Sequence, residues 1–167
     1  MRLARSFLYV PANREKFLET AIRLPSDAFI LDLEDSVPEA EKAAARLAVR
    51  RYAPRFAEGR VWVRTNGLDT AFAEADLEAV IGIVGLAGLF VPKIEAAEEV
   101  LRWDTMIAAR EAACSLGVGT IKLVLSIESA RGQERLASRV QHFRSVDRPG
   151  AAEVGVEIAV ARAAERQ

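Results

Sequence analysis

Short apolar segments alternate along the chain with longer segments in which apolar residues recur every three or four positions. The short segments are rich in β-branched and aromatic residues and end at proline or polar residues, which is typical of buried β-strands. Five strands are expected, over residues 7–10, 28–33, 61–64, 88–91 and 121–127. The intervening segments have the helical period, so helices are expected over residues 13–22, 38–48, 70–81 and 96–114.

This alternation predicts an α/β fold with parallel strands joined by right-handed crossovers. Two architectures are compatible with it, an open doubly wound sheet and a (β/α)8 TIM-barrel type. No glycine-rich fingerprint follows a strand, which disfavours the dinucleotide-binding version of the open sheet. A complete barrel needs at least about 200 residues. The 167 residues of the chain, with about five clear βα units, therefore predict an incomplete barrel.

The C-terminal part differs from the rest of the chain in composition and in its pattern of apolar residues. The last 37 residues contain seven arginines and no lysine, and the pattern shows no clear sixth strand. Weak helical patterns cover residues 134–143 and 151–165. We therefore interpret residues 1–132 as the N-terminal part of a barrel domain and residues 133–167 as an aberrant Arg-rich remnant of the same domain.

Composition and charge argue against several classes of protein. The 23 basic and 24 acidic residues give a net charge of −1, which argues against electrostatic binding of nucleic acid. The apolar runs are too short for a membrane span, and Pro11 interrupts the first of them before it reaches the length of a secretory core. The single cysteine, Cys114, excludes an internal disulfide and a multi-cysteine metal site. A cytoplasmic protein is expected.

Charged residues follow the predicted strands, namely Glu34 and Asp35, Arg64, Lys93, and Glu128. The carboxyl ends of parallel strands meet at one edge, where such groups could hold a divalent cation and an anionic substrate together. Oxygen ligands that include a carboxylate suit Mg²⁺. Structural alternatives stay open: the acidic pair could cap a helix, Lys93 could be a solvated loop residue, and Glu128 could form a salt bridge. Arg64 follows a buried strand, where it needs a partner or a function.

Five segments in chain order resemble the citrate lyase beta-subunit family, which belongs with the HpcH/HpaI aldolases. The motifs Leu-Asp-Leu-Glu-Asp and Pro-Lys-Ile-Glu are the most specific of them. The matching segments are residues 5–11, 30–38, 63–66, 91–95 and 126–132.

The resemblance implies a Mg²⁺-dependent carbon–carbon lyase of the citryl-CoA/malyl-CoA type, which cleaves a 3-hydroxyacyl-CoA ester to an acyl-CoA and a 2-oxo acid. By motif, Arg64 matches the arginine that binds the oxo-acid carboxylate, and Glu128 matches a metal-ligating carboxylate. Glu34 and Asp35 match the acidic pair beside that arginine. Arg5 and Lys93 are expected to bind the substrate or the phosphates of CoA.

One departure from the family pattern concerns the second metal carboxylate, which the family supplies from the next strand. Asp147 is the candidate that the sequence offers, although its neighbours do not form the motif. Two alternatives are therefore kept: a truncated, catalytically inactive family member acting as a binding or interaction module, and a related aldolase that acts on free oxo acids. Because an incomplete barrel exposes strand edges, a homo-oligomer is expected.

Overall fold

The computed structural model describes residues 4–129 and 156–160 of the chain. One six-stranded sheet forms its centre, and all neighbouring strands are parallel. The strands are β1 (Phe7–Pro11), β2 (Ala28–Asp32), β3 (Val61–Arg64), β4 (Leu86–Val91), β5 (Lys122–Ile127) and β6 (Val156–Val160). The helices are α1 (Glu15–Ala21), α2 (Lys42–Tyr52), α3 (Ala73–Val80) and α4 (Ala97–Ala113), with short 3-10 turns at η1 (Glu39–Glu41) and η2 (Ala53–Arg55).

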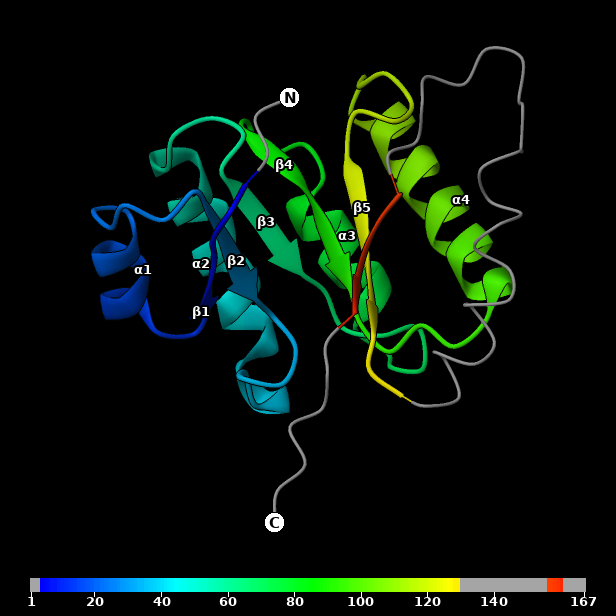
Figure 1. Cartoon of the computed structure of the whole chain (residues 1–167), viewed down its shortest axis with the longest axis horizontal. Helices are drawn as coiled ribbons and strands as arrows, with labels where there is room; N and C mark the ends of the chain where they lie inside the picture. The colour runs from blue at the N-terminus through cyan, green and yellow to red at the C-terminus, as the bar shows by residue number, and fades with distance from the viewer. Residues whose placement is uncertain (1–3, 130–155, 161–167) are drawn as a thin grey trace.

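The order of the strands in the sheet decides between the two predicted architectures. It runs β1-β2-β3-β4-β5-β6, so every strand lies beside its predecessor in the chain (Figure 1). A doubly wound sheet reverses direction at a switch point, whereas the strands of a (β/α)8 barrel advance in one direction. The six described strands therefore have the order of strands in a (β/α)8 barrel, the TIM-barrel type that the sequence predicts.

The two faces of the sheet carry different cores, because successive strand residues point to opposite faces. One face packs under the helices, where strand residues such as Leu31 and Val63 join Trp103 of α4 in a large buried cluster. The other face carries a smaller cluster around Trp62 and Phe90, whose rings lie 5.6 Å apart and nearly perpendicular.

The helices of the structure differ in their bounds from the predicted ones, and the first two show why. The first helix begins at Glu15 without a side-chain cap, and the nearby Asn13 side-chain amide donates to Glu41 Oε2 at 2.6 Å. The helix expected over 38–48 starts as the 3-10 turn η1 after Pro38 and continues as α2 to Tyr52.

The prediction of a helix over residues 151–165 is wrong where the structure describes that segment. Residues 156–160 form β6, which pairs in parallel with β5. The helix predicted over 134–143 and the domain boundary predicted at residue 132 lie outside the described residues. Among the described helices, none has the length and apolarity needed to cross a bilayer.

Candidate functional site

The carboxyl ends of β2, β3 and β4 bring together most of the predicted site residues. Asp32 ends β2 and lies opposite Arg64, the last residue of β3. Asp32 Oδ1 accepts a hydrogen bond from Arg64 Nε, and Oδ2 accepts one from Nη2, both at 2.7 Å. This two-point pairing fixes the plane of the guanidinium and leaves its Nη1 atom facing the loop after β2.

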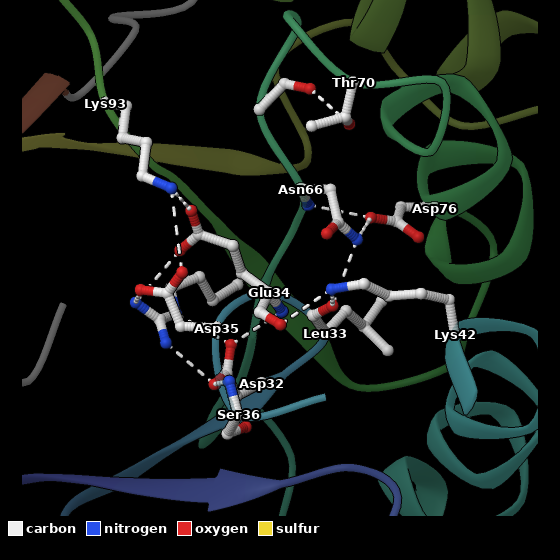
Figure 2. A network of polar contacts seen from close by, with 12 residues as sticks. Asp32, Leu33, Glu34, Asp35, Ser36, Lys42, Asn66, Thr70, Asp76 and Lys93 are labelled. Atoms are coloured by element: carbon white, nitrogen blue, oxygen red, sulfur yellow. Dashed lines mark hydrogen bonds and ion pairs between the residues drawn. The ribbon is translucent and has the colours of Figure 1, made fainter. Parts of the chain in front are cut away.

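The acidic pair after β2 contacts the free side of that guanidinium (Figure 2). Arg64 Nη1 lies 3.0 Å from Glu34 Oε2 and 3.6 Å from Asp35 Oδ2. Lys93 Nζ approaches the same two carboxylates, at 2.9 Å from Glu34 Oε1 and 3.6 Å from Asp35 Oδ1. Neither oxygen of Glu34 makes a directed hydrogen bond, so these contacts are ion pairs of loose geometry. We call Asp32, Glu34, Asp35, Arg64 and Lys93 the rim cluster.

Exposure divides the rim cluster into a fixed part and a movable part. The side chains of Asp32 and Arg64 are 3% and 14% exposed, whereas those of Asp35 and Lys93 are 61% and 54% exposed. Lys93 also has a left-handed backbone conformation, with φ of 55°, which residues other than glycine seldom adopt. Such backbone outliers gather at functional sites.

The pKa values in the rim cluster shift in opposite directions. Burial raises the pKa of Asp32, but hydrogen bonds from Arg64 and Ser36 outweigh it and hold that pKa below its usual value. Burial raises the pKa of Glu34, and here the charges of Lys93 and Arg64 do not compensate. The ion pair with Glu34 raises the pKa of Lys93 despite some desolvation. The folded protein therefore favours the ionised form of Asp32, which anchors Arg64, whereas ionisation of Glu34 costs free energy in the folded protein.

A second, buried network holds the backbone at Leu33 and Glu34 in the loop after β2 (Figure 2). Lys42 Nζ donates to the backbone oxygens of Leu33 at 2.6 Å and Glu34 at 2.7 Å. The Asn66 amide donates to the same Leu33 oxygen at 3.0 Å and to Asp76 Oδ2 at 2.7 Å. We call Lys42, Arg46, Asn66 and Asp76 the scaffold cluster. It fixes the backbone that carries Glu34.

The sequence does not predict several residues in and beside these clusters, including Lys42 and Arg46 of the scaffold cluster. Asp32 falls within the strand predicted over residues 28–33, and a strand assignment alone does not show that it pairs with Arg64 on the next strand. Tyr9 of β1 stacks under Arg64, with the guanidinium carbon 5.1 Å from the ring centroid. Asp76 sits among the apolar positions of α3, where Phe72 and Val80 lie four residues away on either side.

Glu128 follows β5 and lies on the wall of a cavity beside the rim cluster. The cavity has a volume of about 540 Å³. Glu128 makes no hydrogen bond or ion pair with the described residues, although its charge acts on Lys93. The lining residues are Gly67, Leu68, Asp69, Pro92, Lys93, Ile94, Glu95, Glu99, Trp103, Glu128 and Ser129.

Two predicted site residues are not brought to this edge by the described structure. Arg5 precedes β1, at the amino end of the sheet, where its backbone N and its Nε donate to Asp27 Oδ2 at 2.9 and 3.3 Å. Asp147, the predicted candidate for the second metal ligand, lies outside the described residues.

The donor set fits a Mg²⁺ ion only in part. Within residues 4–129 and 156–160, no group of three or more His, Cys, Asp or Glu side chains is arranged to hold a metal. Glu128 offers one carboxylate that is not already paired, while Glu34 and Asp35 are contacted by Arg64 and Lys93. Mg²⁺ is usually held by one or two carboxylates together with water and substrate oxygens, so Glu128 can supply the first of them.

The sequence matches the HpcH/HpaI aldolase/citrate lyase family over residues 5–147. The chain belongs to this family. The citrate lyase subunit beta of Haemophilus influenzae is 37% identical over 134 residues, which are 79% of this chain and 46% of that protein. A (3S)-malyl-CoA thioesterase of Cereibacter sphaeroides is 36% identical over 146 residues, which are 84% of this chain and 46% of that protein.

Solved structures show the same relationship. The protein CitE of Mycobacterium tuberculosis, in complex with magnesium and acetoacetate, superposes with a TM-score of 0.60 and 31% identity, covering 82% of this chain and 51% of that one. A complex of the same protein with magnesium, acetoacetate and coenzyme A gives a TM-score of 0.60 and 31% identity, covering 82% of this chain and 45% of that one. This member of the HpcH/HpaI family thus spans about half the length of the relatives that it matches.

Proposed function

We propose that this chain carries the oxo-acid-binding part of a Mg²⁺-dependent carbon–carbon lyase site of the citryl-CoA/malyl-CoA type. The reaction cleaves a 3-hydroxyacyl-CoA ester to an acyl-CoA and a 2-oxo acid. The observation that carries the proposal is the guanidinium of Arg64, which Asp32 holds by two bonds while its Nη1 atom faces the rim. An arginine fixed in this way presents a directed donor for a carboxylate.

In this proposal Arg64 binds the carboxylate of the oxo acid. The substrate displaces Glu34 and Asp35 from Nη1, which their loose contacts at 3.0 and 3.6 Å allow. Lys93 is half exposed and contacts the same two carboxylates, so it can follow them or turn to the substrate. Asp32 keeps Arg64 in position throughout. Arg5 has no role in this proposal, because the structure places it at the other end of β1.

Charge balance supports a divalent cation at this edge. Arg64 and Lys93 carry two positive charges, whereas Asp32, Glu34, Asp35 and Glu128 carry four negative charges when ionised. An anionic oxo acid would add to this excess, and a cation bound at Glu128 would offset it. A Mg²⁺ ion there would act as a Lewis acid on the oxo-acid carbonyl and on the developing enolate oxygen. Solved relatives that bind magnesium with acetoacetate are consistent with this assignment.

A second candidate function is binding without turnover. It is favoured by the side chains at this edge, because residues 4–129 and 156–160 contain no group of three or more His, Cys, Asp or Glu arranged to hold a metal. A related aldolase that acts on free oxo acids is less consistent with relatives named for CoA esters. The expected homo-oligomer and cytoplasmic location stay predictions, and light scattering after gel filtration tests the first.

A titration followed by thermal unfolding tests the proposal. Oxaloacetate or glyoxylate with Mg²⁺ should raise the melting temperature, and Arg64→Lys and Glu128→Gln should each abolish most of that shift. Arg46→Lys is the matched control, because Arg46 is equally exposed (14%) and also binds an aspartate at 2.7 Å, yet lies in the scaffold cluster. Release of acyl-CoA from malyl-CoA or citryl-CoA separates a lyase from a binding module. If oxo acid and Mg²⁺ do not change the melting temperature, both the lyase and the binding module are ruled out.

A further inference from the structure

The backbone of Glu34 is held on both sides, so its carboxylate stays in the rim cluster when a ligand arrives. Its backbone N–H donates to Asp32 Oδ1 at 2.9 Å, and its backbone oxygen accepts from Lys42 Nζ at 2.7 Å (Figure 2). The side chain is 7% exposed, and neither carboxylate oxygen is accessible to solvent. A ligand that replaces Glu34 on Arg64 therefore leaves the Glu34 carboxyl buried.

Two cations keep the buried carboxylate of Glu34 ionised. Arg64 Nη1 lies 3.0 Å from Oε2, and Lys93 Nζ lies 2.9 Å from Oε1. Burial raises the pKa of Glu34 even in the presence of both cations. A ligand carboxylate on Nη1 would take one of these cations and add a negative charge beside Glu34. Both changes disfavour the ionised form of a buried carboxyl.

The groups around Glu34 that are firmly charged or firmly neutral do not respond in the same way. The pKa of Asp32 is held below its usual value and that of Lys93 is raised, so both groups keep their charges near neutral pH. Burial raises the pKa of Tyr9, which keeps its hydroxyl neutral there. The charged and titratable groups that face Glu34 are Tyr9, Asp32, Asp35, Lys42, Arg64 and Lys93.

Lys42 and Asp35 are also poor candidates for a change of charge. Burial lowers the pKa of Lys42, but its two acceptors are backbone oxygens that a ligand on Arg64 does not touch. Asp35 is 61% exposed, so water compensates when it loses its contact with Arg64. Among the described groups, Glu34 is the one that loses a cation while it stays buried.

We propose that binding of an oxo-acid carboxylate to Arg64 is coupled to the uptake of a proton from solvent by the carboxylate of Glu34. The proton replaces the ion pair that the ligand removes, because a neutral carboxyl needs no counter-charge. The inference rests on the proposed function for the class of ligand. It adds a regulation of that site by pH.

The sign of the pH dependence follows from linkage. The pKa of Glu34 is higher in the complex than in the free protein, so affinity for the oxo acid rises as the pH falls through the pKa of the complex. It levels off once Glu34 is protonated in the free protein as well. Between these two limits the dissociation constant changes by at most about tenfold per pH unit, the value for one coupled proton.

Calorimetry with glyoxylate measures the coupled proton directly. At each pH, the titration is repeated in MES and in cacodylate, whose ionisation enthalpies differ, so the difference in apparent binding enthalpy gives the protons taken up. Mg²⁺ is kept saturating, so that the charge at Glu128 does not change. We expect uptake and a falling affinity with rising pH in the parent chain, between about pH 5 and pH 8.

Two variants assign the proton. Glu34→Gln should bind glyoxylate without proton uptake, and its advantage over the parent chain should vanish at low pH, where the parent chain is already protonated. Asp35→Asn is the matched control and should keep the uptake, because Asp35 is exposed. Infrared difference spectra give a second readout: glyoxylate should produce the carbonyl band of a protonated carboxyl in the parent chain and not in Glu34→Gln.

Failure of this inference is distinguishable from failure of the proposed function. Binding of glyoxylate by the parent chain without proton uptake overturns the inference and leaves the role of Arg64 in place. Equal uptake in Glu34→Gln, or loss of uptake in Asp35→Asn alone, overturns the assignment to Glu34. If neither the parent chain nor Glu34→Gln binds glyoxylate with Mg²⁺ at any of these pH values, the proposed function and the inference are both wrong.

Discussion

Two Arg–Asp pairs in this molecule share one contact of the same length and differ in their second hydrogen bond and in their surroundings. Arg64 pairs with Asp32 in the rim cluster, and Arg46 pairs with Asp76 in the scaffold cluster. In both pairs Nε lies 2.7 Å from Oδ1, the arginine side chain is 14% exposed, and the aspartate is buried. Arg64 adds a second hydrogen bond, from Nη2 to Asp32 Oδ2, whereas no described residue accepts from Arg46 Nη2. The Nε–Oδ1 distance and the exposure of the arginine therefore do not by themselves separate a functional arginine from a structural one.

The partners of each pair make the difference. Asp76 Oδ2 accepts from the backbone N–H and the side-chain amide of Asn66 at 2.8 and 2.7 Å, and Arg46 stacks over the ring of Phe72. These added partners are neutral. Arg64 instead shares its Nη1 atom between two further carboxylates, and a half-exposed lysine contacts both. A site that exchanges ligands needs surplus charge with movable partners, whereas a scaffold pair is best surrounded by neutral donors.

The largest effect is expected for Asp76→Ala. The substitution leaves a buried guanidinium without its carboxylate and two donors of Asn66 without an acceptor. Breaking a buried pair in this way costs about 3–5 kcal/mol. Urea denaturation should show this loss of unfolding free energy. A loss below about 1 kcal/mol would show that the scaffold cluster does not hold the loop before α3.

Asp32→Ala should cost less, about 1–3 kcal/mol, although it removes a pair of the same length. Arg64 keeps Glu34 as a partner at 3.0 Å from Nη1, whereas among the described residues no second carboxylate pairs with Arg46. The same urea experiment measures the difference. If the two alanine variants lose equal free energy of unfolding, the second carboxylate beside Arg64 does not reduce the cost of removing its aspartate.

The pH dependence of stability should also distinguish Asp32. Its pKa is held below the ordinary value of 3.8, so the folded protein binds its proton less tightly than the unfolded chain. This stabilisation is fully present above about pH 4 and is lost as the pH falls through the lowered pKa. The stability gap between the parent chain and Asp32→Asn should therefore narrow below pH 4, in urea titrations between pH 7 and pH 3. A constant gap would show that Asp32 is not the ionised anchor.

The sequence predicted the rim more completely than the scaffold, for physical reasons. Glu34, Asp35, Arg64 and Lys93 follow apolar strands, so parallel topology alone places them at one edge. Asp76 lies on the apolar side of α3. The helical period of apolar residues does not predict that a carboxylate at such a position is a buried hydrogen-bond acceptor. The register that sets Asp32 opposite Arg64 depends on strand pairing, which no local pattern specifies.

At residues 156–160 the sequence-based prediction assigned the wrong secondary structure. The alanine-rich surroundings favour a helix by propensity, yet Val156, Ile158 and Val160 alternate with the period of a strand. In the structure this segment pairs with β5. Pairing with a neighbouring strand overrides a helical preference that is weak per residue, and the predicted helix over 151–165 ignored the shorter period.

The smallest effect on stability, but a clear one on binding, is expected for Glu34→Gln. Burial raises the pKa of Glu34, so the folded protein binds its proton more tightly than the unfolded chain, and ionisation above that pKa costs stability. Glutamine removes this cost and also removes the ion pairs with Arg64 and Lys93, so the free energy of unfolding at pH 7 should change by less than about 1 kcal/mol.

Binding of the oxo acid should respond differently, because Glu34 competes with it for Arg64 Nη1. Removing that competitor and one negative charge should tighten oxo-acid binding by about threefold to tenfold in calorimetry. Asp35→Asn is the matched control, since Asp35 lies farther from Nη1, at 3.6 Å, and is 61% exposed, so water already screens most of its charge. Weaker binding in Glu34→Gln would mean that Glu34 orients Arg64 instead of masking it. The rim cluster would then work as a fixed site like the scaffold cluster, and the distinction between the two pairs would rest on the charge of their other partners alone.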